Sequence, residues 1–159
     1  MLYLDSSALI KHYLAERGTQ ALNARLDEEQ KSLRSPFTSV LTYAEVHAAL
    51  ARLKKEGKLT TDQAVGVQDK FDSDWVLTIS PIDCGAAVLG LVRNVVAEAP
   101  LRGADAVHLA SALWLRDSAK LGVRKGHYTG ALVFASSDLQ LLKAAHKHRI
   151  EVFNPEKTK

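Results

Sequence analysis

Leu2-Tyr3-Leu4-Asp5-Ser6-Ser7 opens the chain, as a short apolar run that ends on an aspartate and two serines. A second run, Ala131-Leu132-Val133-Phe134-Ala135, leads into Ser136-Ser137-Asp138 in a similar way. Short continuous apolar runs are typical of strands that are buried on both faces of a parallel sheet. We therefore expect two buried strands, each followed by an aspartate.

The segments between these runs alternate between helical and strand-like patterns. Helices are predicted from Ser6 or Ser7 to about 16, then to about 32, and at 41–56, 60–72, 82–98, 104–121 and 138–147. Further strands are predicted at 35–38, 75–79 and 150–153. This alternation favours an α/β fold in which helices cover both faces of a parallel sheet. Without an internal repeat or linker, residues 1–159 are predicted to form a single domain.

Three local patterns sharpen this prediction. Pro36 makes the segment at 35–38 a poor candidate for a fully paired central strand, because proline donates no hydrogen bond. Thr60 and Gln63 have the spacing of a capping box at a helix start. The helix at 82–98 is apolar nearly all round, which predicts that it is well buried. The two helices within 41–72 could form a protruding hairpin.

Four acidic residues lie where such a sheet would bring them together: Asp5, Glu45, Asp105 and Asp138. Asp5 and Asp138 follow strands, and ligand sites in open parallel sheets form beyond the carboxyl ends of strands, where strand order reverses. Glu45 and Asp105 share their helix faces with leucines and alanines, so both carboxylates point toward the predicted core. One shared pocket accounts for all four positions.

Each acid also has a structural interpretation, as a helix cap, a capping-box member or an ion-pair partner. The residues concerned are Ser6 or Ser7 as alternative caps for the first helix, Thr42 before Glu45, Ser137 with Gln140 around Asp138, and Arg102 beside Asp105. A pocket of four carboxylates would otherwise be disfavoured by repulsion, which a hard divalent cation offsets. We expect Mg²⁺ or Mn²⁺, with Asp5 and Asp105 as direct ligands, because these cations prefer oxygen donors.

Other polar and aromatic residues support this site less directly. Ser6 and Ser136 flank the acids and could orient them, or a metal-bound water, by hydrogen bonding. His108 lies one helical turn from Asp105, but no second zinc-ligand cluster accompanies it, so we interpret it as a structural histidine. Trp75 and Trp114 are interpreted as core residues.

Composition limits the remaining possibilities. A net charge of +3 leaves a basic surface if four acids occupy one pocket, and basic stretches around 116–127 and 143–149 could contact a phosphate backbone or simply be solvated. The lone Cys84 excludes an internal disulfide and suits a reducing compartment. Without a signal pattern or a run of about 20 apolar residues, we expect a cytoplasmic protein that does not span a membrane.

Four stretches resemble the motifs of the PIN-domain nucleases, particularly the VapC-type toxin ribonucleases of prokaryotic toxin–antitoxin pairs. They are Tyr3-Leu4-Asp5-Ser6-Ser7-Ala8-Leu9, Ser39-Val40-Leu41-Thr42-Tyr43-Ala44-Glu45, Leu101-Arg102-Gly103-Ala104-Asp105-Ala106-Val107-His108-Leu109-Ala110 and Ser136-Ser137-Asp138. Their order along almost the whole chain is that of the family. The basic, glycine-containing stretch at 118–130 departs from the family pattern, because it is longer than the usual connection.

The resemblance implies a three-layer α/β/α sandwich on a five-stranded parallel sheet, and metal-dependent endoribonuclease activity on RNA. It implies that Asp5, Glu45, Asp105 and Asp138 are the acidic site residues, and that Ser6 and Ser136 support them. A homodimer and inhibition by a cognate VapB-type antitoxin are further implications. Arg102 or the basic stretch could hold the RNA backbone through phosphate contacts that specify little sequence.

Two other functions compete with this interpretation. A haloacid-dehalogenase-like phosphatase with Asp5 as nucleophile would need a second aspartate two residues later, where Ser7 stands. A non-catalytic PIN module would bind RNA or a protein partner, but such modules commonly lack some of the acids, and here all four are present.

Overall fold

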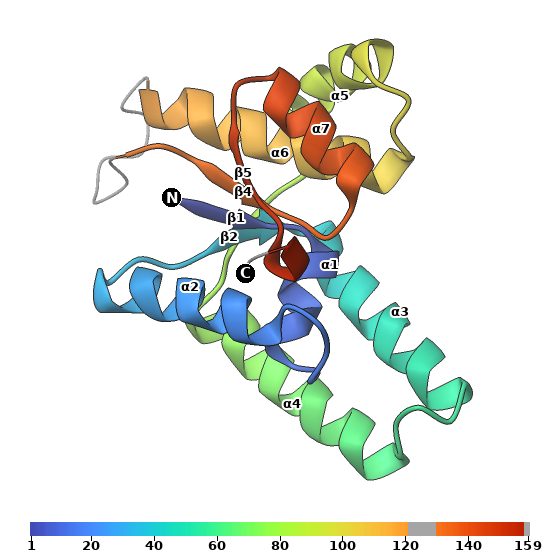
Figure 1. Cartoon of the computed structure of the whole chain (residues 1–159). Coiled ribbons are helices and arrows are strands. Elements are labelled where there is room, and N and C mark those ends of the chain that lie inside the picture. Colours follow the sequence, from blue (N-terminus) through green and yellow to red (C-terminus); the bar gives the residue numbers. More distant parts are fainter. Residues whose placement is uncertain (121–129, 158–159) are drawn as a thin grey trace.

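The structure is a computed structural model that describes residues 1–120 and 130–157. These residues form one five-stranded parallel sheet with helices on both faces, which confirms the expected three-layer α/β/α sandwich (Figure 1). The strands are β1 (Leu2–Leu4), β2 (Phe37–Ser39), β3 (Ser80–Ile82), β4 (Val133–Ala135) and β5 (Glu151–Phe153). The α-helices are α1 (Ser6–Leu9), α2 (Thr19–Lys31), α3 (Leu41–Lys55), α4 (Thr61–Leu77), α5 (Ala86–Glu98), α6 (Gly103–Lys120) and α7 (Leu139–Lys147), and the 3-10 turns are η1 (Ile10–His12) and η2 (Pro155–Lys157).

The sheet order is β3-β2-β1-β4-β5, so the chain leaves β1 in one direction and later returns to its other side. β1 pairs in parallel with β4, and Leu4 lies opposite Ala135. The point where strand order reverses is therefore between β1 and β4. Both strands expected from the opening pattern end at this point, followed by Asp5 and by Ser136–Asp138.

Alternation along the central strands divides the core between the two faces of the sheet. Tyr3 and Phe134 pack with α5, α6 and α7, whereas Leu2, Leu4 and Val133 pack with the first four helices. Successive strand side chains point to opposite faces, and each face here carries its own helical layer. This explains why the strands have continuous apolar sequences.

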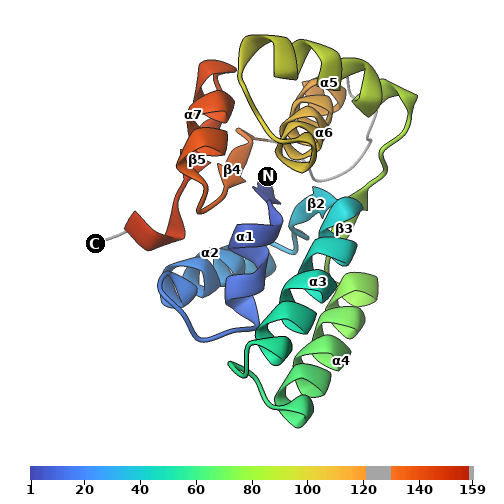
Figure 2. The ribbon, with the colours of Figure 1, turned by 90° about the vertical axis from the view of Figure 1, so that its right-hand side faces the viewer.

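The helices α3 and α4 lie side by side and extend away from the sheet as a hairpin (Figures 1 and 2). The predicted capping box at its turn is confirmed, since the Thr60 and Gln63 side chains each accept from the other residue's backbone N–H. The helix then continues to Leu77, so the predicted strand at 75–79 is wrong. Phe71 is fully buried and Trp75, one helical turn later, packs against the same core cluster, which favours continuation of the helix.

Two further expectations are wrong. β2 pairs with both β1 and β3, although Pro36 was expected to prevent full pairing. Pro36 precedes the strand, where its missing N–H does no harm, and its carbonyl accepts from the Ser80 N–H at 2.9 Å. The helix α5 starts four residues later than predicted and is buried on one side only, because Leu89 and Val96 are exposed.

The C-terminal turn η2 packs against the segment between η1 and α2. Gly18 has φ +92°, and an added Cβ would lie 2.9 Å from the carbonyl carbon of Pro155. Only glycine accommodates both this backbone conformation and this close approach. The turn thereby brings Glu156 beside Lys11.

Residues 121–129 lie outside the described residues, and with them most of the basic stretch expected around 116–130. Within the described ranges, no helix is both long and apolar enough to cross a membrane.

Candidate functional site

Asp5 is buried at the end of β1, and its carboxylate is held by several hydrogen bonds. Oδ1 accepts from the Ala8 N–H at 2.8 Å, so Asp5 itself caps α1, and the alternative caps Ser6 and Ser7 do not. The Ser136 hydroxyl donates to Oδ2 at 2.6 Å, and the Ser7 hydroxyl lies 2.8 and 2.9 Å from the two oxygens. Burial raises the pKa of Asp5, while nearby His108 and these hydrogen bonds oppose the rise.

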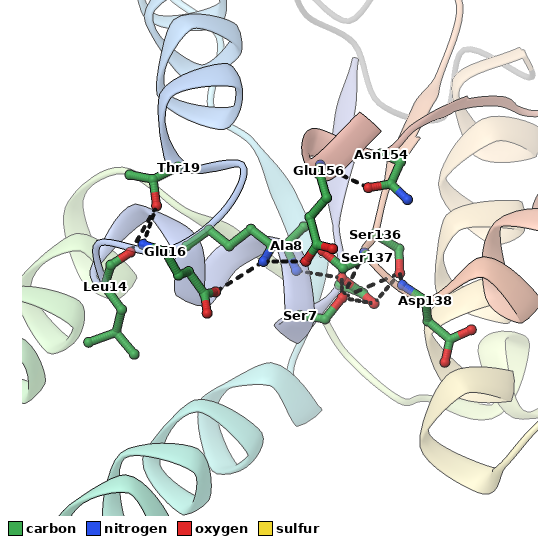
Figure 3. Close-up of polar contacts among 12 residues, drawn as sticks. Ser7, Ala8, Leu14, Glu16, Thr19, Ser136, Ser137, Asp138, Asn154 and Glu156 are labelled. Carbon is green, nitrogen blue, oxygen red and sulfur yellow. Dashed lines mark hydrogen bonds and ion pairs between the residues drawn. The ribbon is translucent and has the colours of Figure 1, made fainter. Parts of the chain in front are cut away.

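The two serines join the ends of β1 and β4 (Figure 3). The Ser7 hydroxyl accepts from the Ser137 N–H at 2.9 Å, and the Ser136 hydroxyl accepts from the Asp138 N–H at 2.9 Å. Each hydroxyl therefore links Asp5 to the backbone that follows β4. Ser136 thus lies where sequence reasoning expected a supporting residue. Ser6 has no side-chain hydrogen bond within the described residues, and Ser7, one position later, contacts Asp5 instead.

Asp138 is exposed and caps α7. Its Oδ1 accepts from the Gln140 and Leu141 N–H groups at 2.7 and 2.9 Å. The alternative box of Ser137 with Gln140 is therefore not formed. The sequence interpretation places Asp138 in the first turn of this helix behind a Ser137 cap, whereas Asp138 is itself the cap.

Glu45 lies on α3 and is held by a histidine from α6. The His108 Nε2 lies 2.8 Å from Glu45 Oε2, and the His108 Nδ1 lies 3.0 Å from the Tyr3 hydroxyl. The capping box expected between Thr42 and Glu45 is absent, because the Thr42 hydroxyl instead bonds that of Thr38 at 2.6 Å. His108 is fully buried, so its interpretation as a structural residue omitted its contact with a candidate site acid.

Asp105 lies in the first turn of α6 and is half-buried. Burial and then the neighbouring Asp138 raise its pKa most, and Glu45 contributes in the same direction. His108 and Arg102 lower the pKa but do not cancel the rise. Within the described ranges, Asp105 forms no side-chain hydrogen bond or ion pair, so the expected pair with Arg102 is not formed. Its charge is the least compensated of the four.

A groove of about 630 Å³ lies between the start of the chain and α3, and of the four acids Glu45 lines it. Ser6 and Ser7 also line it, together with three cationic side chains, Lys11, Arg52 and Arg102, and two further carboxylates, Glu16 and Glu156. Arg52 and Arg102 are exposed, whereas Lys11 is buried between two carboxylates. The groove therefore offers an elongated anion two exposed cations in the groove that Glu45 lines.

The donor set suits a hard divalent cation in its chemistry. All four candidates are carboxylates, and the pKa of Asp105 is raised by burial first and then by Asp138, whose repulsion a bound cation would offset. In residues 1–120 and 130–157, however, no three His, Cys, Asp or Glu side chains are gathered closely enough to form a ready-made metal site. Asp105 is thus in electrostatic contact with Asp138 and Glu45, and His108 acts electrostatically on both Asp5 and Asp105, without a preformed ligand shell in the described residues.

Comparison with known proteins gives a consistent set of relatives. The chain is 34% identical over 117 residues to Ribonuclease VapC45 of Mycobacterium tuberculosis (strain CDC 1551 / Oshkosh). These 117 residues are 74% of this chain and 78% of the relative. It is 31% identical over 116 residues to Ribonuclease VapC47 of the same strain, covering 73% and 77%. No protein-family model matches the chain.

Solved structures share the fold at low sequence identity. FitAcB from Neisseria gonorrhoeae superposes with a TM-score of 0.69 at 16% identity, covering 99% of this chain and 100% of the other. VapBC2 from Rickettsia felis, bound to a DNA fragment from its promoter, gives a TM-score of 0.65 at 12% identity, covering 97% and 98%. The architecture described above is therefore shared along nearly the whole chain.

Proposed function

This chain belongs to the VapC family of ribonucleases, and from that premise we propose that it is a divalent-metal-dependent endoribonuclease and the toxin of a toxin–antitoxin pair. The observation that carries the proposal is the position of Asp5 and Asp138 directly after the two strands between which strand order reverses, with Asp105 close enough to Asp138 for their charges to repel. An arrangement of this kind is poorly explained by stability, because like charges raise the free energy of the folded state.

Each acid has a distinct place in the proposed reaction. Asp5 and Asp105 would hold Mg²⁺ or Mn²⁺, which supplies a bound water of lowered pKa and offsets charge on the reacting phosphate. Ser7 and Ser136 hold the Asp5 carboxylate in one orientation. Glu45 has Oε2 occupied by His108, which leaves Oε1 to accept a proton from the attacking water. Asp138 adds negative charge at the same edge.

The substrate would lie along the groove that Glu45 lines. The exposed side chains of Arg102 and Arg52 would contact phosphates on either side of the scissile bond. Contacts of this kind position a nucleic acid without reading its sequence. The groove therefore supports RNA as the substrate class and leaves the choice of RNA to other contacts.

Partners follow from the solved structures that share the fold, which include FitAB bound to IR36 DNA and VapBC2 bound to promoter DNA. By analogy we propose a VapB-type antitoxin as the partner of this chain, and a homodimer of the toxin. The thiol of Cys84 is free, which suits the reducing cytoplasm where this complex would act.

A phosphatase mechanism through Asp5 is disfavoured by the contacts of Ser7. Ser7 stands where a general-acid aspartate would be needed, and its hydroxyl instead donates to the Asp5 carboxylate.

The test uses purified protein and structured RNA with Mg²⁺ or Mn²⁺, with and without a chelator. We expect cleavage that the chelator abolishes. Asp5→Asn and Asp105→Asn should each lower the rate by more than the roughly tenfold to hundredfold typical of residues that act through a ligand. Asparagine also caps helices, so Asp5→Asn keeps the start of α1. Asp69→Asn, an exposed aspartate of α4, is the matched control.

Each other outcome has a defined meaning. Metal-dependent cleavage that survives both substitutions would contradict the site assignment. Cleavage that ignores the chelator would contradict the metal dependence. Tight RNA binding without cleavage of any RNA would favour the non-catalytic module.

A further inference from the structure

His108 connects the core of the sheet to a candidate site acid, and neither the sequence pattern nor the family resemblance assigned it a role. We propose that His108 is a positioning residue that fixes the Glu45 carboxylate, and that Tyr3 fixes His108 in turn. This inference rests on the proposed function, because Glu45 is its endpoint. The chain Tyr3–His108–Glu45 joins β1, α6 and α3, whose residues are up to 105 positions apart.

The first link holds the imidazole in place from the core. Tyr3 is fully buried and stacks on Phe134, with ring centroids 5.1 Å apart and planes at 13°. It meets the His108 ring edge-on, at 6.1 Å and 82°. The tyrosine ring therefore has little freedom to move, and its hydroxyl is aimed at His108 Nδ1 at 3.0 Å.

The two hydrogen bonds of His108 together determine which imidazole nitrogen carries the proton. The Tyr3 hydroxyl lies 3.0 Å from Nδ1, and a phenol carries its proton at neutral pH, so it can donate that proton to Nδ1. A neutral imidazole that accepts at Nδ1 carries its proton on Nε2. That Nε2–H then donates to Glu45 Oε2 at 2.8 Å. The opposite tautomer would set the Nε2 lone pair against a carboxylate oxygen, which is repulsive.

The consequence for the site is a fixed orientation of Glu45. Its side chain is 30% exposed and would otherwise be free to turn within the groove. With Oε2 held by a buried donor, Oε1 is the oxygen left for the water or the substrate. A histidine oriented by its second nitrogen is a recurrent device around catalytic carboxylates and metals.

Two substitutions separate positioning from simple packing. His108→Gln can place an amide N–H near the position of Nε2, and so keep the donor to Glu45. His108→Asn can place its amide near Nδ1, and so keep the partner of Tyr3. We expect His108→Asn to lower kcat by about 10- to 100-fold with KM within about twofold, and His108→Gln to recover much of that loss. If the two variants are equally active, or His108→Asn is the more active, the proposal is wrong.

A spectroscopic measurement tests the same contact without activity. In ¹⁵N spectra of histidine-labelled protein, His108 should show a proton on Nε2, and Tyr3→Phe should mix its tautomers. Glu45→Gln should shift the Nε2 signal of His108 but not that of His146, which is exposed on α7. A proton on Nδ1 alone would overturn the proposal, even if a histidine variant fails to fold.

The nuclease function and the positioning role of His108 can be contradicted separately. If the wild-type protein cleaves no RNA but His108 shows the expected proton and the shift in Glu45→Gln, the proposed function is wrong and the contact stands. If RNA is cleaved and His108→Asn leaves kcat unchanged, the positioning role is wrong and the nuclease function stands.

Discussion

Two groups of charged side chains differ in how their charges are balanced: the clasp cluster of Lys11, Glu16 and Glu156, and the acid cluster of Asp5, Glu45, Asp105 and Asp138. In the clasp cluster, Lys11 Nζ lies 3.1 Å from a Glu16 oxygen and 2.7 Å from a Glu156 oxygen. This cluster ties η1 to the C-terminal turn η2, and the Glu16 and Glu156 side chains reach toward the same place (Figure 3). The single buried cation has two internal partners.

The acid cluster of Asp5, Glu45, Asp105 and Asp138 has no equivalent. His108 is its buried partner, and the exposed Arg102 lowers the pKa of Asp105 without forming an ion pair with it in the described part of the chain. A charged group that finds its partner within the fold contributes to structure. A group that lacks one raises the free energy of the folded state until a ligand supplies the opposite charge. The contrast between the clusters supports the proposal that the clasp cluster stabilises the fold and that the acid cluster binds a ligand.

Removing the buried cation should have the largest effect on stability. Lys11→Met keeps most of the aliphatic chain but leaves two carboxylates facing each other. We expect a loss of about 2 kcal/mol in the free energy of unfolding, below the full cost of breaking a buried pair because both glutamates reach solvent. Urea unfolding measures it.

The matched control is Lys58→Met. Lys58 pairs with Glu56 at 2.8 Å, and both side chains are well exposed, so no measurable change is expected. Equal effects of the two substitutions would mean that the clasp cluster is only another surface ion pair.

Supplying the missing positive charge to the acid cluster should have the next largest effect. At a concentration about ten times its Kd, Mg²⁺ should add about 1.4 kcal/mol, which corresponds to a rise in Tm of a few degrees. The rise should disappear in Asp5→Asn and Asp105→Asn and persist in Asp69→Asn. A rise that is the same in all four proteins would show that the ion acts elsewhere.

Removing one uncompensated acid should have a smaller effect of opposite sign to that of Lys11→Met. Without divalent cations, Asp105→Asn should raise the free energy of unfolding by about 0.5 kcal/mol, because it relieves repulsion of the size found between partly exposed charges. Thermal melting in chelator measures this. Destabilisation by this substitution would mean that Asp105 has an internal partner after all.

The sequence predicts where some residues of the acid cluster lie, but not the contacts that hold them. Asp5 and Asp138 could be placed because each follows an apolar strand, and strand ends meet where strand order reverses. Which residue caps the next helix could not be decided, since Asp5, Ser6 and Ser7 are all able to cap and only the end of β1 selects Asp5. The hydrogen bond between Tyr3 and His108 could not be predicted either, because a contact between residues far apart in the sequence leaves no local sequence pattern.

Two helices also differ from what their sequences predict, because tertiary packing decides their ends and their burial. The window from Trp75 to Ile79 is rich in strand-forming residues, yet tertiary packing of Phe71 and Trp75 extends α4 through Leu77. Tertiary packing of a helical face against the core therefore overrides the intrinsic preference of these residues for a strand. Likewise, the apolar sequence of α5 predicted burial on all sides, whereas Leu89 is 53% exposed.

The smallest predicted effect is a difference in pH dependence between the clusters. The hydrogen bond from Lys11 lowers the pKa of Glu156, whereas burial and Asp138 raise that of Asp105. A lowered folded-state pKa gives stability that is present above the unfolded value, about 4.3 for glutamate, and lost as pH falls through the folded value. A raised pKa does the reverse, since the folded state then binds the proton more readily and its penalty disappears below the unfolded value of about 3.9.

Two variants compared with the wild-type protein from pH 7.5 to about pH 3, at low salt and in chelator, reveal this difference, since the Glu156 contribution is lost only below about pH 4.3. At neutral pH, Glu156→Gln should melt below the wild-type protein and Asp105→Asn above it. Acidification should shrink both differences, because it neutralises the carboxylate that each variant lacks. The two differences should therefore approach zero from opposite sides. Differences of the same sign at neutral pH would mean that both clusters are balanced within the fold, and the acid cluster would then lose its physical argument for binding a cation.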